Sequence, residues 1–276
     1  MDFYENEKVA LYLNNLNLIE DSSSSIQNVQ LYKHDQLGKV LIIDDEIQHV
    51  ENWIPYYHEA ITHIPSMFIE KIEKVLILGG GDLYAASEIL KYNSVKKIVL
   101  CDHDINVINL TERYYTHAKN VLSDKRFCLV VSDAIKYINE CSEKFDLIID
   151  DCFNLVDAFE NEKIFNTLKS MLSSNGVCCS LVYRHIYDKN IMCKTAERLF
   201  RNHKTIISLV TVPEYPGIFH ILSMWGNSVY LNQNMETSKN KEHIDSFNLK
   251  CELFNSNYCK YYLHIPKYLE SVLKYI

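Results

Sequence analysis

From Lys74 onward, short apolar runs alternate with segments of helical spacing. Five apolar runs have the pattern of buried strands: KVLILGGG, KKIVLCDHD, FCLVVSDA, FDLIIDDC and GVCCSLVY. Four helical segments lie between them: DLYAASEILKY, INVINLTERYYTHA, IKYINECS and NEKIFNTLKSML, the last ended by SSNG. Strands that alternate with helices at this spacing predict an α/β fold, a doubly wound parallel sheet covered by helices on both faces.

The chain before Lys74 has a different, β-like pattern. Residues 28–50 contain two apolar runs, with HDQLG as the turn between them. PYYHEAITHIPSMF then reads as a helix that begins near Pro55 and ends at Pro65, and DSSSS at residues 21–25 reads as a loop. We therefore expect residues 1–70 to form a small β-rich domain with a connecting helix, and residues 71–276 to form a Rossmann-like domain.

Composition excludes several functions. The formal net charge is −8 and no Lys/Arg-rich run occurs, which argues against nucleic acid as a partner. No stretch approaches the roughly 18 uncharged apolar residues of a membrane span, and the amino end lacks the basic and apolar regions of a secretory signal. The nine cysteines have no CxxC spacing. We expect a cytoplasmic protein with reduced thiols and no metal site.

Three of the seven glycines follow the first strand of the α/β part, as Gly79, Gly80 and Gly81. A glycine-rich turn at this place lets the backbone approach a ligand closely, and an acidic residue at the end of the second strand can bind ribose hydroxyls. Asp102 ends that strand, about 20 residues later. The pattern is GGGD and not GxGxxG, which favours an adenosyl ligand without phosphates over NAD.

Several segments together resemble one family. YYHEA, VLILGGGD, IVLCDHD, SDA and FDLIIDDC occur in the order and spacing of the spermidine synthase (polyamine aminopropyltransferase) family. LIIDDEIQ resembles its LDGVIQ segment, VPEYPG its P-T-Y-P segment, and YYLHIPKYLESVL its carboxy-terminal helix. The resemblance runs from about residue 28 to the end and implies a Rossmann-like fold of the class I methyltransferase type.

The resemblance also implies an activity. Members transfer an aminopropyl group from decarboxylated S-adenosylmethionine to putrescine or a related small amine and release methylthioadenosine. The adenosyl compound is then a co-substrate, and no permanently bound cofactor is expected. The partner is a small polyamine substrate, and the assembly is a homodimer.

Roles for individual residues follow from the same resemblance. Asp151 is the general base that takes the proton of the attacking amine, since a free alkylamine titrates near 10. Asp150 lies beside it, and alternation along the strand places the two on opposite faces. Tyr57 and Tyr215 border the amine, and His58, Asp82 and Asn154 meet the aminopropyl or polyamine chain. The donor is held by Gln48, Gly79, Gly80, Gly81, Asp82, Asp102, Asp133 and Ala134, with Gln48 and Asp102 at the ribose and Asp133 at the adenine.

Asp82 bears on the choice of donor. Ordinary S-adenosylmethionine carries a carboxylate that a nearby aspartate repels, whereas the decarboxylated donor presents only an ammonium. At about 4 Å and an effective dielectric constant near 20, this change of sign amounts to several kcal/mol. Asp82 therefore favours aminopropyl over methyl transfer.

Some positions depart from the family pattern. Leu83 and Tyr84 stand where small residues normally follow GGGD, and Asn154 replaces the second carboxylate of a D-x-x-D motif. The loss of that charge predicts an altered acceptor or a weakened enzyme. Two alternatives stay open: an S-adenosylmethionine-dependent N-methyltransferase on the same fold, and a paralogue that serves as a binding or partner subunit without turnover.

Overall fold

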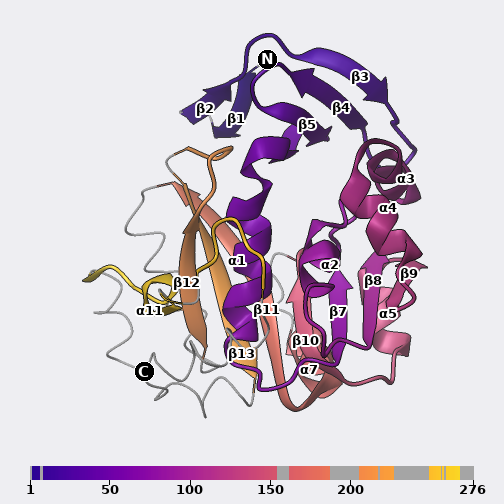
Figure 1. The fold of residues 1–276 in the computed structure, drawn as a ribbon, viewed down its shortest axis with the longest axis vertical. Helices are drawn as coiled ribbons and strands as arrows, with labels where there is room; N and C mark the ends of the chain where they lie inside the picture. Colours follow the sequence, from indigo (N-terminus) through magenta and orange to yellow (C-terminus); the bar gives the residue numbers. More distant parts are fainter. Residues whose placement is uncertain are drawn as a thin grey trace.

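The amino-terminal part of the protein is antiparallel. The computed structural model describes residues 2–6, 9–153, 162–186, 205–216, 218–226, 249–255, 257 and 259–267. The first pair of strands is β1 (Asp2–Asn6) and β2 (Val9–Tyr12). A four-stranded sheet follows in the order β3-β4-β5-β6 (Figure 1), formed by β3 (Asn17–Asp21), β4 (Val29–His34), β5 (Gly38–Ile43) and β6 (Glu46–Val50).

The second apolar run predicted in this part is in fact two strands. Asp44 and Asp45 form a two-residue hairpin turn, since Ile43 pairs with Glu46 on either side of them. Both aspartates have positive φ, 50° and 65°, as the hairpin turns that match strand twist require. Aspartate tolerates this left-handed region better than most residues, so Asp-Asp can turn the chain without glycine. The prediction of two strands was therefore wrong at this turn, and residues 28–50 form three.

Helix α1 (Ile54–Ser66) connects the two parts of the chain. Pro55 lies in its first turn and Pro65 in its last, as predicted. The helix packs on the large sheet described below, and one apolar core includes Leu31 and Leu41 of the small sheet, Ile61 of α1 and Val75 of the large sheet. The small sheet and the α/β part therefore share a continuous core across the boundary that the sequence suggested at residue 70.

The large sheet has seven strands in the order β12-β13-β11-β10-β7-β8-β9. Its members are β7 (Lys74–Leu78), β8 (Lys97–Asp102), β9 (Phe127–Val131), β10 (Phe145–Asp150), β11 (Leu172–Ile186), β12 (Ile206–Thr211) and β13 (Ile218–Gly226). The described helices that accompany it are α2 (Tyr84–Ile89), α3 (Ile105–Tyr114), α4 (Thr116–Ser123), α5 (Ala134–Glu140), α7 (Glu162–Met171) and α11 (Cys259–Tyr262).

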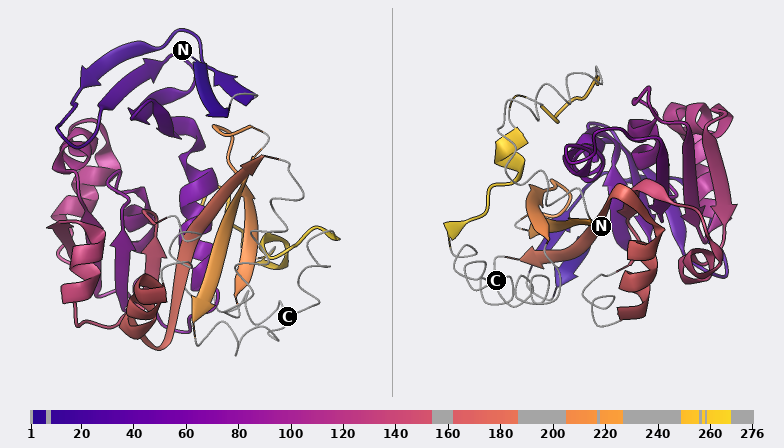
Figure 2. Two further views of the ribbon diagram at one scale, coloured as in Figure 1. Left: turned by 180° about the vertical axis from the view of Figure 1, so that it is seen from behind. Right: turned by 90° about the horizontal axis from the view of Figure 1, so that it is seen from below.

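The predicted doubly wound sheet is confirmed, with one antiparallel strand. β9, β8, β7, β10 and β11 are parallel, whereas β13 runs antiparallel to both β11 and β12. A parallel neighbour needs a crossover of a dozen or more residues, and the turn between β12 and β13 is much shorter. Figure 2 shows the small sheet arching over the end of the large sheet from two further directions.

Two other boundaries differ from the prediction. The segment INVINLTERYYTHA is two helices and not one, because Tyr115 is extended (φ −124°, ψ 128°) and buried between α3 and α4. The predicted loop SSNG lies within β11, where pairing with β10 skips from Leu172 to Val177. The predicted carboxy-terminal helix is described only as far as residue 267, and the rest of YYLHIPKYLESVL lies outside the described residues.

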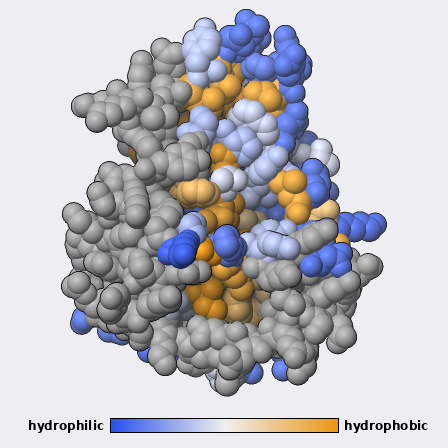
Figure 3. All heavy atoms as spheres, turned by 90° about the vertical axis from the view of Figure 1, so that its left-hand side faces the viewer, coloured by the Kyte–Doolittle hydropathy of each residue, from blue (hydrophilic) through white to orange (hydrophobic). Residues whose placement is uncertain are grey.

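The surface on the side of β12 has an apolar centre. Figure 3 shows hydrophobic side chains in the middle of this face, and hydrophilic side chains mixed with hydrophobic ones along the small sheet above them. Within the part of the chain that is described, no helix is long and apolar enough to cross a membrane. The seven cysteines whose side chains are described are free thiols.

Candidate active site

A cavity opens where the direction of strand succession reverses. From β7 the chain proceeds outward through β8 and β9, then returns to β10 on the other side of β7. In doubly wound sheets the carboxyl ends of the strands at this switch point form the binding crevice. Here the small sheet covers it, and the enclosed volume is about 290 Å³. The lining includes Leu41, Ile43, Gln48, Tyr57, His58, Gly79, Gly80, Gly81, Asp82, Asp102, His103, Asp151, Cys152, Glu214, Tyr215 and His220.

Each of the three consecutive glycines has a separate reason to be glycine. Gly79 and Gly80 have φ of +80° and +74°, a region that favours residues without a side chain. Gly81 does not, but a Cβ atom there would lie 2.9 Å from Oδ2 of Asp102. A Cβ atom on Gly79 would lie 3.0 Å from the backbone oxygen of Asp151. The turn after β7 thus brings bare backbone against the ends of both β8 and β10.

Asp102 is partly buried, with its carboxylate packed against Gly81 of this turn. Its Oδ1 accepts a hydrogen bond from the backbone N–H of Asp104 at 2.9 Å. Burial raises the pKa of its carboxyl group, against the opposing effect of backbone hydrogen bonds from Asp104 and Gly81. A carboxylate in this position is available to accept hydrogen bonds from a ligand in the cavity.

The neighbouring carboxyl groups at the end of β10 have different surroundings. Asp151 lines the cavity, and the hydroxyl of Tyr57 donates a hydrogen bond to its Oδ1. Asp150 is fully buried, and its Oδ1 accepts a hydrogen bond from the backbone N–H of Phe153 at 2.9 Å. Burial raises the pKa of Asp150 to about 7. Asp150 therefore belongs to the turn after the strand, whereas Asp151 is accessible to a ligand.

Asp82 is held by two histidines. Its Oδ2 lies 3.0 Å from Nε2 of His58 and 3.2 Å from Nδ1 of His49, and its Oδ1 accepts the backbone N–H of Tyr84 at 3.1 Å. Burial by itself lowers the pKa of His58, but the charge of Asp82 and the hydrogen bond to it raise that pKa to about 9. The same contacts hold the pKa of Asp82 well below its usual value, although burial opposes them. His58 and Asp82 form an imidazolium–carboxylate pair.

This pairing changes the argument made from the sequence for the donor. The positive charge of His58 compensates much of the negative charge that Asp82 would present to a ligand. The carboxylate of ordinary S-adenosylmethionine is therefore repelled less strongly than an isolated aspartate predicts. The charge of Asp82 is therefore not sufficient to discriminate between methyl and aminopropyl transfer.

The bulky residues that follow GGGD leave the cavity open. Tyr84 is not among the cavity residues. Its ring stacks on that of His117, with the centroids 3.5 Å apart, and meets the edge of His49. Leu83 is fully buried in the apolar core, with φ of 65°. Tyr84 therefore does not narrow this cavity.

The comparison with known families decides the relationship of this chain. The family model described as "Spermine/spermidine synthase domain" matches residues 54–232. The chain belongs to this family.

Relatives and solved structures agree with that membership. The chain is 29% identical over 272 residues to the polyamine aminopropyltransferase of Buchnera aphidicola subsp. Acyrthosiphon pisum (strain Tuc7), an alignment that covers 95% of this chain and 93% of the relative. It is 30% identical over 218 residues to the polyamine aminopropyltransferase of Hydrogenobaculum sp. (strain Y04AAS1), covering 77% of each. The fold matches a spermidine synthase crystallised with the transition-state analogue AdoDATO, with a TM-score of 0.82, 23% identity, and coverage of 98% of this chain and 92% of that one.

Most of the residues singled out from the family resemblance line the cavity. Gln48, Tyr57, His58, Asp82, Asp151 and Tyr215 do so, together with the glycine turn and Asp102. Asp133 and Ala134 are not among the lining residues: Asp133 is exposed and caps α5 by accepting the N–H of Lys136 at 2.8 Å. Asn154 lies outside the described residues. The roles of all these residues, lining or not, stay predictions.

Several residues of the site were not singled out from the sequence, among them His49, Glu214 and His220. His49 follows Gln48 on β6, and its Nδ1 lies 3.2 Å from Oδ2 of Asp82. Glu214 lies within VPEYPG, between residues that match the family pattern. His220 had no usable signal, because the sequence did not locate the antiparallel strand that carries it.

The ion pair of His58 and Asp82 predicts a pH dependence of stability. Because the pKa of His58 is raised in the folded protein to about 9, the stabilisation is fully present below the unfolded value near 6.5 and is lost as the pH rises through 9. We expect His58→Gln to lower the free energy of unfolding by about 3 kcal/mol more at pH 6 than at pH 10. Denaturant unfolding of both proteins at the two pH values measures this difference. Equal losses at both values would mean that His58 is neutral in the fold.

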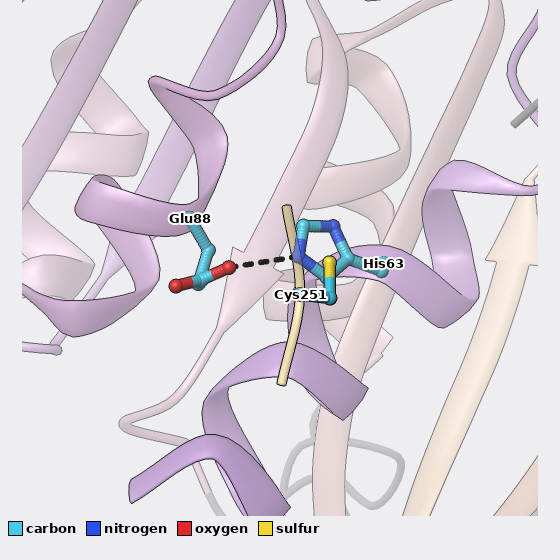
Figure 4. A group of neighbouring side chains, drawn as sticks. All are labelled: His63, Glu88 and Cys251. Carbon is cyan, nitrogen blue, oxygen red and sulfur yellow. Dashed lines mark hydrogen bonds and ion pairs between the residues drawn. The ribbon is translucent and has the colours of Figure 1, made fainter. Parts of the chain in front are cut away.

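A second cluster joins α1, α2 and the segment before α11. His63, Glu88 and Cys251 have potential ligand atoms within 4.8 Å of one another, and Figure 4 shows the sulfur beside the imidazole ring. His63 is already paired, through Nε2 to Glu88 at 2.9 Å and through Nδ1 to the hydroxyl of Tyr92 at 2.8 Å. Glu88 also pairs with Lys91 at 2.5 Å. Both imidazole nitrogens of His63 therefore have protein partners, and the ion pair with Glu88 links α1 to α2.

Proposed function

We propose that this protein transfers an aminopropyl group from decarboxylated S-adenosylmethionine to a small diamine or polyamine. One observation carries the proposal: Asp151, a carboxylate bonded by Tyr57, shares a single cavity with the glycine turn after β7 in a member of the spermine/spermidine synthase family. The proposed base and the backbone proposed to hold the donor therefore lie in the same cavity, where a donor and an acceptor amine could bind side by side. The related spermidine synthase bound to AdoDATO supports the decarboxylated donor as co-substrate. We expect no permanently bound cofactor.

The chemistry needs a proton acceptor and an aligned nucleophile. At neutral pH the amine is protonated, because alkylamines titrate near 10. Asp151 takes that proton, and the freed lone pair attacks the carbon attached to the sulfonium. The new C–N bond forms as the C–S bond breaks, and the bonding electrons pass to sulfur, which leaves as the neutral thioether of methylthioadenosine. The hydroxyl of Tyr57 orients the carboxylate of Asp151 for this transfer.

The charge of the cavity suits cationic ligands. Four carboxyl groups line it, those of Asp82, Asp102, Asp151 and Glu214, and the raised pKa of His58 gives one positive charge against them. A cleft lined mainly by negative charges attracts cations, which here are the amine and the sulfonium donor. The N-methyltransferase and the partner subunit without turnover are not favoured, since the family and both relatives named above point to aminopropyl transfer.

Binding of methylthioadenosine tests the donor half of the proposal. A ligand at 100 times its dissociation constant adds roughly 2.7 kcal/mol to the free energy of unfolding. We expect a clear thermal shift with methylthioadenosine and with the decarboxylated donor, and none with NAD. Asp102→Ala should weaken this binding without unfolding the chain, because it removes a carboxylate at the cavity and little core volume. A shift with NAD alone would overturn the proposal.

Two broader expectations accompany the activity. We infer, from the family resemblance, that the protein works as a homodimer in the cytoplasm. Gln48 and Asp102 at the ribose, with Asp133 and Ala134 at the adenine, remain the proposed donor contacts. His58 and Tyr215 remain the proposed contacts to the aminopropyl and amine groups, with Asn154 beside them.

A further inference from the structure

Glu214 is a buried carboxyl group that the reaction described above does not use. It lies in the turn between β12 and β13 and is only 3% exposed. The backbone N–H groups of Val50 and of Glu214 itself donate hydrogen bonds to the carboxyl group. Its Oε2, however, has no hydrogen-bond partner among the described residues. Burying a carboxylate oxygen without a partner is costly, so a fold that keeps one there suggests a missing cationic ligand.

Glu214 lies near the residues that are proposed to bind the acceptor amine. The turn that carries it reaches up to the small sheet (Figure 1), where the hydroxyl of Tyr215 donates a hydrogen bond to the carbonyl oxygen of Ile47. Glu214 lines the same cavity as Tyr57 and Asp151, and His220 packs against the rings of both Tyr57 and Tyr215. Aromatic faces next to a carboxylate are a favourable environment for an ammonium group.

The sequence shows a matching exchange of charge. Asn154 stands where the family pattern D-x-x-D has its second aspartate, so one carboxylate is lost after β10. Glu214 stands where the family pattern P-T-Y-P has threonine, so one carboxylate is gained before Tyr215. Compared with that family pattern, the sequence thus has one carboxylate fewer after β10 and one more before Tyr215.

We propose that Glu214 binds the second ammonium group of the acceptor, the one that is not attacked. The acceptor is then an α,ω-diamine or a longer polyamine, and a monoamine of the same length lacks the group that Glu214 recognises. This inference rests on the proposed aminopropyl transfer for its kinetic test, though not for its binding test.

Ionisation of Glu214 is consistent with such a role. Burial raises the pKa of Glu214 to about 7, and the nearby charge of His58 partly offsets this. Among the described residues, the titratable groups that share the cavity with it are those of Tyr57, His58, Asp82, Asp102, His103, Asp151, Cys152, Tyr215 and His220. An arriving ammonium favours the charged carboxylate, so binding of a diamine should strengthen as the pH rises through about 7.

The kinetic test compares 1,4-diaminobutane with n-butylamine. In Glu214→Gln and in Glu214→Thr, the ratio of the two kcat/KM values, diamine over monoamine, should fall about 10- to 100-fold, as expected for loss of a charge-assisted hydrogen bond. In the unsubstituted protein this ratio should rise between pH 6 and pH 8, and in Glu214→Gln it should stay flat. The exposed Glu112→Gln serves as the matched control and should leave the ratio unchanged.

A binding test separates this inference from the proposed function. Calorimetry of the protein with methylthioadenosine measures binding of each amine without turnover. Stronger binding of the diamine that is lost in Glu214→Gln supports the role of Glu214, even if no amine is aminopropylated. An unchanged preference in both variants, with methylthioadenosine binding and thermal stability intact, overturns it. If both variants lose thermal stability and the binding of both amines equally, Glu214 is structural and the inference is also wrong.

Discussion

Replacing Asp151 with asparagine lowers kcat by about 10²- to 10⁴-fold or more, while methylthioadenosine binding stays near its original value. The reason is that an amide cannot accept the ammonium proton, and general-base catalysis typically contributes this factor. The hydroxyl of Tyr57 can still donate to the amide oxygen at the same place, so the geometry of the site should survive. Initial rates with decarboxylated S-adenosylmethionine and 1,4-diaminobutane measure the effect.

The matched control is Asp35→Asn, since Asp35 is an exposed aspartate in the turn between β4 and β5. It should change neither kcat nor the binding of methylthioadenosine. Retention of full turnover in Asp151→Asn would contradict the assignment of the base. Loss of nucleotide binding together with turnover would instead make Asp151 a residue that shapes the site.

Replacing Glu59 with alanine lowers the free energy of unfolding by about 2–4 kcal/mol, the loss expected when a buried charged acceptor is removed. Glu59 is 3% exposed on α1, and its carboxylate accepts the backbone N–H groups of Glu252, Leu253 and Phe254 at 2.7, 2.9 and 2.6 Å. These bonds hold the segment before α11 against the helix. Thermal and denaturant unfolding measure the loss.

Hydrogen exchange gives this prediction a local readout. The amides of residues 252–254 should exchange faster in Glu59→Ala, whereas amides of the central strand β7 should change only by the global loss. Glu252→Ala, an exposed substitution in the same segment, is the control and should stay within about 0.5 kcal/mol of the original stability. Unaltered exchange at residues 252–254 would mean that the carboxylate does not hold the segment.

Local patterns predicted much of this protein. The apolar run Val75–Leu78 is buried throughout, as a strand covered on both faces must be. The glycines after it were located because a turn from strand to helix often needs positive φ, which depends on neighbours in sequence. Asp102 was located because it ends the next apolar run. Asp151 was separated from Asp150 by the same short-range rule of alternation, with the family resemblance choosing between them.

The failures of prediction come from contacts between distant residues. Asp82 and His49 are 33 residues apart, and their pairing with His58 changes the charge that Asp82 offers to a donor. Tyr115 breaks a helical pattern because its ring packs in the core and its hydroxyl meets His49 at 3.0 Å. Strand β13 is antiparallel because a short turn follows β12, and this brings Glu214 and His220 into the cavity.

The sequence by itself thus determined the class of fold and the place of the glycine turn, because periodicity and turn chemistry act over a few residues. Only the tertiary structure decided which of the carboxylates are neutralised and which remain available. Charge and ionisation depend on burial and on partners within a few ångströms. For Asp82 and Glu214 those partners come from elements far away along the chain: His49 and His58 for the first, and Val50 for the second.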